Sequence, residues 1–280
     1  MTHSAQRGTC HFFFFYCRLF ALVSSLALGP VNPLFAQESK IDIWETFLKP
    51  RYFPDITLIE GRSIVDLKTP YRSEDAAFTP VSIVSSIPQS PERYIDKMYL
   101  FVERNPQPLV GIFDLTTEVG QADLAMRIRV DQYTNVILVA ILNDGEHHFT
   151  KKYVKASGGC SAPLTADFKT AMERIGKMKF RVVDSDTRND LFIGQFLLSH
   201  PNITGLQKDQ KTRLIRPEHY VKKVVLYQGG KRLMTADMGF SVSADPSFRF
   251  FFTKLGDKNI TAEVSDSKGL KWSRSFALDH

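Results

Sequence analysis

Residues 151–163 read KKYVKASGGCSAP and lie near the middle of the 280-residue chain. Strand-like sequence precedes this stretch, and a helical segment and further strand-like sequence follow it, so it separates two halves of the chain. Gly158 and Gly159 stand directly before Cys160 and leave the backbone there without Cβ atoms. Three lysines lie shortly upstream, and positive charge favours the thiolate form of a nearby cysteine. The stretch therefore predicts a mobile, exposed and reactive thiol between two domains.

Residues 1–36 are typical of a secretory signal peptide. Arg7 and Arg18 supply positive charge, residues 19–28 read LFALVSSLAL, and residues 34–36 form a cleavage site of the Leu-Phe-Ala type. The apolar run is too short for a membrane span of ordinary length. We therefore expect Sec-type export, cleavage, a periplasmic location and no membrane attachment after cleavage. A retained N-terminal anchor is the alternative.

Cys10 and Cys17 fall in this segment, so Cys160 is the only cysteine expected in the mature chain. Exported proteins usually pair their cysteines, and an unpaired one indicates an intermolecular disulfide or a working thiol. A buried, inert cysteine is the alternative, but no large apolar residue flanks Cys160, which favours exposure. The mature chain keeps 34 of the 36 Lys and Arg against 30 Asp and Glu, a net charge of +4. Because these charges are scattered and no nucleic-acid-binding motif occurs, we expect no nucleic-acid partner.

Short β-rich runs separated by turn residues occur on both sides of residues 151–163. In the first half, residues 122–130 alternate between apolar and polar, and residues 135–142 are almost continuously apolar, as in a buried strand. In the second half, residues 177–183 alternate, and Gln228-Gly229-Gly230 is a hairpin signal. We therefore predict an all-β fold with two immunoglobulin-like β-sandwiches joined by a short helical connector.

Two segments break the strand pattern. Residues 165–176 read TADFKTAMERIG, with apolar residues on one face and a closing glycine, which predicts the connector helix. Residues 41–50 have helical spacing, with Trp44 and Phe47 as core anchors and Pro50 as the stop. The predicted organisation is a signal peptide (1–36), a first sandwich ending in the Gly-Gly-Cys arm (37–163), the connector (164–176) and a second sandwich (177–280).

No set of residues in the sequence indicates catalysis. No CxxC motif occurs, and no second mature cysteine is available to resolve an oxidised thiol. His147 and His148 lie beside a turn and lack ligand-spaced partners, His200 is a candidate structural residue, and the acidic residues of 184–190 lack the spacing of a calcium loop. We therefore expect no catalytic residue, no metal and no cofactor.

The two halves resemble two known families. Residues 55–160 resemble SoxY, the sulfur-carrier subunit of the periplasmic thiosulfate-oxidation system, and residues 177–278 resemble SoxZ, its partner. The SoxY-like stretches are Asn105–Pro108, Arg127–Arg129, Asp144-Gly145 and Lys155–Cys160. The SoxZ-like stretches are Ser199–Asp209, Ile215–Pro217, Tyr227–Lys231 and Ser243–Pro246. The best match is the fused SoxYZ-like carrier associated with quinoprotein dehydrogenases.

This resemblance implies a carrier and not an enzyme. In the family, the thiol of a Gly-Gly-Cys arm bears the sulfur of the substrate covalently while partner enzymes act on it. Applied to this chain, the resemblance implies that Cys160 is the covalent carrier and that Gly158 and Gly159 form the flexible arm. The implied partners are periplasmic redox enzymes or cytochromes, either a quinoprotein dehydrogenase or Sox-type proteins, and a sulfur-containing small molecule bound to Cys160.

The position of the cysteine departs from the family. SoxY ends just after its cysteine, whereas 120 residues follow Cys160 here. Six extended residues after Val154 would span about 20 Å, at about 3.3–3.6 Å per residue, and a tether at both ends shortens that reach. The alternative is a non-catalytic binding or assembly module for a periplasmic quinoprotein dehydrogenase or its cytochrome, without thiol chemistry.

Overall fold

A computed structural model describes residues 41–164, 167–186, 190–210, 212–253, 256 and 258–278. The predicted signal peptide, Cys10 and Cys17 lie outside the described residues. Residues 42–280 form one compact unit. Among the described residues, no helix combines the length and the apolar character that crossing a membrane requires.

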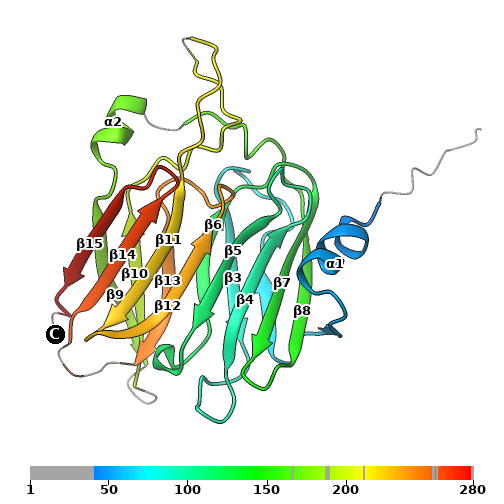
Figure 1. The fold of residues 1–280 in the computed structure, drawn as a ribbon, viewed down its shortest axis with the longest axis vertical. Coiled ribbons are helices and arrows are strands. Elements are labelled where there is room, and N and C mark those ends of the chain that lie inside the picture. The colour runs from blue at the N-terminus through cyan, green and yellow to red at the C-terminus, as the bar shows by residue number, and fades with distance from the viewer. Residues whose placement is uncertain are drawn as a thin grey trace, which may run out of the picture. The chain divides into compact units, whose positions relative to one another are not determined.

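The described elements are nearly all strands (Figure 1). The first half contains η1 (Trp44–Leu48), α1 (Lys49–Tyr52), β1 (Ile59–Glu60), β2 (Val65–Lys68), β3 (Thr79–Ser85), β4 (Ile95–Val102), β5 (Leu109–Leu115), η2 (Thr117–Val119), β6 (Leu124–Ile128), β7 (Thr134–Leu142) and β8 (His147–Val154). The second half contains α2 (Phe168–Glu173), β9 (Met178–Asp186), β10 (Leu191–Leu198), β11 (Val221–Gln228), β12 (Lys231–Met238), β13 (Ser247–Thr253), β14 (Ile260–Asp266) and β15 (Lys271–Phe276).

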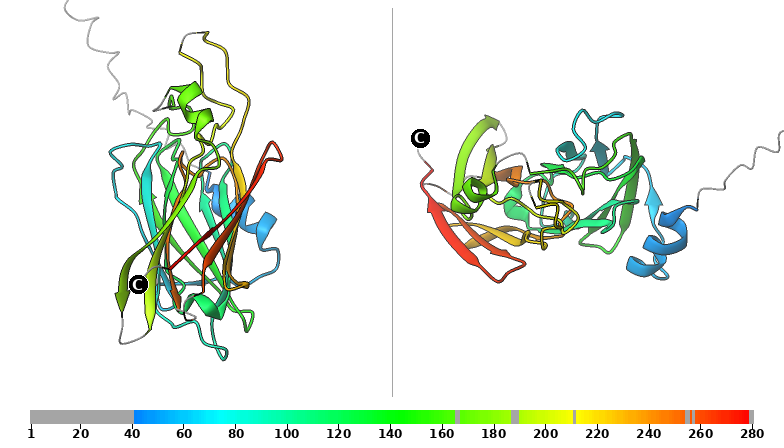
Figure 2. Two further views of the ribbon diagram at one scale, coloured as in Figure 1. Left: turned by 90° about the vertical axis from the view of Figure 1, so that its left-hand side faces the viewer. Right: turned by 90° about the horizontal axis from the view of Figure 1, so that it is seen from above.

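These strands form two sheets that lie face to face (Figure 2). The nine-stranded sheet has the order β1-β8-β7-β4-β5-β12-β11-β14-β15, and the six-stranded sheet has the order β2-β3-β6-β13-β10-β9. The predicted all-β fold is confirmed, and so is the short helix, α2, between the halves. The sequence did not predict that both sheets run through both halves, by antiparallel pairing of β5 with β12 and of β6 with β13.

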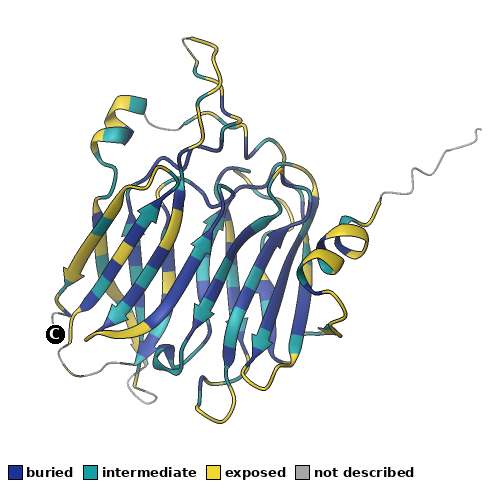
Figure 3. Ribbon diagram, viewed as in Figure 1, coloured by how far each residue is buried: buried dark blue, intermediate teal, exposed yellow. Residues whose placement is uncertain are grey.

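One hydrophobic core extends through both halves between the sheets. Each strand contributes to this core through every second side chain. In β6, Leu124, Met126 and Ile128 are buried while the residues between them are partly exposed. Phe196 and Phe248 occupy the same core in the second half, and each is fully buried. Burying one such side chain is worth about 1.5–3 kcal/mol. Figure 3 shows the buried positions along the strands.

The helical segment near the start of the described chain packs beside β7 and β8. Trp44 is buried, and its ring lies 5.7 Å from that of Phe101 and 6.0 Å from that of Phe149, so its predicted role as a core anchor is confirmed. Phe47 is 53% exposed, so its predicted anchor role is wrong. Pro50 is not a stop either, since it lies in the first turn of α1, where proline is tolerated.

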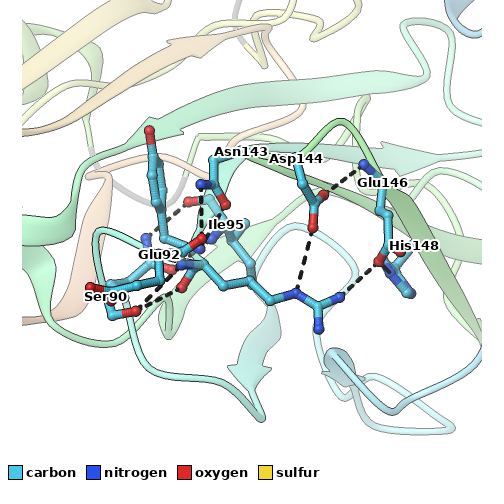
Figure 4. A network of polar contacts seen from close by, with 10 residues as sticks. Ser90, Glu92, Ile95, Asn143, Asp144, Glu146 and His148 are labelled. Atoms are coloured by element: carbon cyan, nitrogen blue, oxygen red, sulfur yellow. Dashed lines mark hydrogen bonds and ion pairs between the residues drawn. The ribbon is translucent and has the colours of Figure 1, made fainter.

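The predicted turn at Asn143–Gly145 joins β7 to β8, and two adjacent histidines follow it. Figure 4 shows the contact of His148 with Glu146. His148 Nε2 lies 3.1 Å from Glu146, and His147 Nδ1 lies 2.8 Å from the Gly145 carbonyl oxygen. The Glu146 carboxylate also accepts a 2.8 Å hydrogen bond from Arg93. These contacts give the histidines a structural role in the turn.

Candidate functional site: the docked Cys160 arm

Cys160 lies in the connection between β8 and α2, and its segment is docked onto the first half. The backbone N–H of Gly158 donates to the Asp131 carbonyl oxygen at 2.8 Å, and that of Gly159 donates to the Val130 carbonyl oxygen at 3.0 Å. The Cys160 N–H donates to the Asp131 carboxylate at 3.1 Å. The N–H groups of three successive residues are therefore bonded to Val130 and Asp131, shortly after the end of β6.

Side chains from both halves hold the carbonyl groups of the same segment. Arg129 donates to the Gly159 carbonyl oxygen at 2.9 Å. From the second half, Thr204 Oγ1 donates to the Cys160 carbonyl oxygen at 2.6 Å, and Gln207 Nε2 donates to the Ala162 carbonyl oxygen at 2.9 Å. The arm is thus fixed on both sides, at the point where the two halves meet.

The two glycines have different local roles in this docked state. Gly158 has φ of +78°, a left-handed conformation that glycine adopts without strain. A Cβ on Gly159 would lie 2.6 Å from the Val130 carbonyl oxygen, and closer still to the Ala76 carbonyl oxygen. Gly159 is therefore required for close backbone approach. The predicted role of both residues as a flexible arm stays a prediction.

The thiol itself is fully buried, so the prediction of an exposed, low-pKa thiol is wrong for this conformation. Burial raises the pKa of Cys160 to about 12, the Asp131 carboxylate adds to the rise, and the Arg129 charge opposes it. The upstream lysines are not among the groups that act on the pKa of Cys160. The exposed Lys151 lies on β8, and the Lys155 ammonium lies over the ring of Tyr71, 4.8 Å from its centroid. At neutral pH the docked thiol is protonated and unreactive.

Asn202 anchors the loop that carries Thr204 and Gln207. It is fully buried with φ of +41°. Its Nδ2 donates to the carbonyl oxygens of Val242 and Ser243 at 3.2 and 3.1 Å, and its Oδ1 accepts the Val221 N–H at 3.1 Å. The Asn202 side chain therefore connects this loop to β11 and to the segment after β12.

His200, His219 and Asp266 form the buried cluster that comes closest to a metal site, with three possible ligand atoms within 4.8 Å of one another. His200 Nδ1 accepts the Asn202 N–H at 3.1 Å, so in neutral His200 the proton lies on Nε2. That proton faces Asp266 Oδ2 at 3.6 Å, and His219 Nε2 lies 2.6 Å from the same oxygen. A metal on His200 Nε2 would require an imidazolate, so we interpret the cluster as a structural polar network.

This network makes stability depend on pH. Burial, with the nearby His219, lowers the pKa of His200 from 6.5 to about 4. Because the unfolded chain binds this proton first, stability is lost as the pH falls from about 6.5 toward 4, by up to about 3 kcal/mol. We expect His200→Asn, whose Oδ1 can still accept the Asn202 N–H, to lose less stability over this range than the wild type.

Urea unfolding at pH 7.5, 6 and 5 measures this difference. His147→Asn, at the start of β8, is the matched control and should keep the wild-type pH slope. An unchanged pH slope in His200→Asn would show that His200 is not the titrating group.

Two family models match this chain. The model described as sulfur oxidation protein SoxY matches residues 50–160, and the model described as sulphur oxidation protein SoxZ matches residues 179–277. The chain is a SoxYZ-like fusion. Its SoxY region ends at Cys160, its SoxZ region begins after α2, and together the two regions cover about three quarters of the 280 residues. The docked arm therefore lies at the junction of the SoxY and SoxZ regions.

Comparison with solved structures adds partial similarities to this SoxYZ-like chain. The sulfur carrier protein SoxY from Chlorobium limicola f thiosulfatophilum is 23% identical, over 39% of this chain and 88% of that one, with a TM-score of 0.33. A superoxide reductase (neelaredoxin) from Ignicoccus hospitalis is 12% identical, over 33% and 79% of the two chains, with a TM-score of 0.29. No curated protein matches. Because both TM-scores are low, the assignment of the chain to SoxY and SoxZ rests on the two family models.

Proposed function

We propose that this SoxYZ-like chain is a periplasmic carrier that holds a sulfur compound covalently on Cys160 and offers it to partner enzymes. The observation that carries the proposal is the position of Cys160: it closes the region matched by SoxY, directly after Gly158 and Gly159, and the SoxZ region follows in the same chain. Both matched families are sulfur oxidation proteins, and the proposed role is that of a carrier and not of a catalyst.

The covalent step is the formation of one S–S bond. Joining the Cys160 thiol to a cargo thiol breaks two S–H bonds and releases two protons and two electrons. A periplasmic cytochrome or another redox partner takes up the electrons. Exchange with a cargo disulfide gives the same bond without net oxidation, and one thiolate leaves.

Loading requires the arm to leave its docked position. The connection from β8 to α2 contains the 13 residues between Val154 and Phe168, and an outward hairpin of half that length reaches about 20 Å. Because burial is the main cause of the raised pKa of Cys160, undocking returns the thiol toward ordinary reactivity. The docked arm is thus a protected resting state.

The partners and the location belong to the same proposal. We propose export to the periplasm on the sequence pattern of residues 1–36. The link to a quinoprotein dehydrogenase or its cytochrome rests on the sequence resemblance alone. Sox-type sulfur-oxidation proteins are the partner class that the two matched families favour.

The second candidate function is an assembly module without thiol chemistry. It is favoured by the complete burial of Cys160 and by the bonds that hold its segment to both halves. In that case Cys160 fixes the junction of the SoxY and SoxZ regions, and the surfaces of the two sheets recruit the dehydrogenase or its cytochrome.

Intact mass measurement distinguishes the two. We expect the mature protein, purified from its native host without reductant, to carry a sulfur-sized mass that reductant removes. Cys160→Ser should lose both this mass and the biological function while remaining folded, whereas Ser161→Ala, at the exposed neighbouring position, should keep both. A bare thiol under all growth conditions, together with a functional Cys160→Ser, would establish the assembly module instead.

A further inference from the structure

A small cavity lies beside the docked arm, where the two halves meet. Its walls include Arg129 after β6, Arg174 after α2, Asp245 before β13, and Pro163 and Leu164 just beyond the arm. The cavity volume is about 20 Å³, enough for one group the size of a water molecule.

Two guanidinium groups leave a buried donor without a partner at this cavity. Arg129 is 2% exposed; one of its terminal nitrogens donates to the Gly159 carbonyl oxygen at 2.9 Å and the other to the Asn202 carbonyl oxygen at 3.4 Å, while its Nε–H has no partner. The Nε–H of Arg174 is also buried and unpartnered. A buried donor without an acceptor is unfavourable, so both groups favour an acceptor in the cavity.

The charge balance indicates which acceptor. Among the described residues, Arg129 forms no ion pair, although its guanidinium stays charged at any ordinary pH. The one carboxylate on the cavity wall, that of Asp245, lies 3.7 Å from a terminal nitrogen of Arg174. Asp75 favours the Arg129 charge electrostatically but forms no ion pair with it, and the Arg174 and Asp245 side chains are partly exposed. The buried charge without a close counter-charge is therefore that of Arg129, and such a charge is costly.

We infer that this cavity binds a small inorganic anion between the Nε–H groups of Arg129 and Arg174. The volume fits a monatomic halide, or a single oxygen of a larger oxyanion whose other atoms extend outward. A water molecule would satisfy the two donors but would leave the charge uncompensated.

The bound anion stabilises the docked arm. Pro163 and Leu164 form part of the wall and follow Cys160 by three and four positions, so the cavity is complete only while the arm is docked. A ligand that binds only the docked state reduces the open population by the factor 1 + [anion]/Kd. At ten times Kd, labelling of Cys160 through the open state therefore slows about 11-fold.

The test uses the mature protein in sodium gluconate, whose anion is too large for the cavity, with chloride, sulfate or thiosulfate exchanged in at constant ionic strength. We expect a saturable rise in melting temperature and a saturable slowing of N-ethylmaleimide labelling of Cys160. A response to chloride alone identifies a halide site, and a response to sulfate or thiosulfate identifies an oxyanion site.

Variants separate this site from general salt effects. Arg174→Gln should abolish the saturable response, Asp245→Asn should tighten binding several-fold by removing the wall carboxylate, and the exposed Arg249→Gln should behave as wild type. Cys160→Ser should show the same melting-temperature response, so the result does not depend on cargo carriage. A response that does not saturate, or that is unchanged in Arg174→Gln, would overturn the anion site and leave water as the occupant.

Discussion

Replacing Gly159 with alanine is expected to undock the Cys160 arm and to raise the labelling rate of its thiol by about two orders of magnitude. The added Cβ would lie 2.6 Å from the Val130 carbonyl oxygen and closer still to that of Ala76. Both are backbone atoms of packed segments and cannot move aside. The least costly relief is to break the hydrogen bond from the Gly159 N–H to Val130 and lift the arm.

The burial that raises the pKa of Cys160 is lost when the arm opens, so labelling takes place through the open state and its rate follows the open population. Forcing an extra methyl group into a packed site typically costs about 1–3 kcal/mol, and about 1.4 kcal/mol changes the open-to-docked ratio tenfold. A cost of about 3 kcal/mol therefore gives an effect of about two orders of magnitude. The rate of N-ethylmaleimide labelling, followed by intact mass, measures it.

Gly158→Ala is the matched control for this result. Its added Cβ would meet nothing closer than Ser161 Oγ at 4.0 Å, but the φ of +78° costs alanine about 1–2 kcal/mol. We therefore expect a clear but smaller increase in labelling. If folded Gly159→Ala protein labels as slowly as wild type, the close approach described at Gly159 is not what holds the arm.

The strands were predictable from the sequence, but the way in which they join was not. Period-two alternation in β6 and the continuous apolar run of β7 are local properties of the chain. The pairing of β5 with β12 and of β6 with β13 joins residues more than 100 positions apart, and neither strand of a pair carries a local signal that selects its partner. A fold of two separate sandwiches and a fold with shared sheets therefore have the same local sequence pattern.

The buried thiol was mispredicted because small residues have two physical meanings. A backbone without Cβ atoms is mobile when it is free, but it also permits the close packing seen at Gly159. Only contacts with distant parts of the chain distinguish a mobile glycine segment from a packed one. Here these contacts come from Asp131 and from Thr204, which lies 44 positions beyond Cys160. Thr204 and Gln207 fall within the quoted SoxZ-like stretch, so the resemblance marked their segment but not their contact with the arm.

Asn202→Asp is expected to cause the largest loss of stability among these variants, about 4 kcal/mol at pH 7. The amide Nδ2 donates to the carbonyl oxygens of Val242 and Ser243, so a carboxylate would place a fully buried negative charge against two acceptors. Removing one side of a buried polar network and leaving a charge uncompensated typically costs about 3–5 kcal/mol. Urea unfolding measures the loss.

The pH dependence of this loss identifies its cause. Burial against two carbonyl oxygens should raise the pKa of the new carboxyl group above its unfolded value, so the stability loss relative to the wild type at the same pH grows as the pH rises and shrinks near pH 4. Asn259→Asp, at an exposed asparagine, should change stability little at either pH. Because Asn202 anchors the loop that carries Thr204 and Gln207, Asn202→Asp should also speed the labelling of Cys160 at pH 7. A stability loss below about 1 kcal/mol would contradict the anchoring role, because a loop held independently of Asn202 would keep the arm docked.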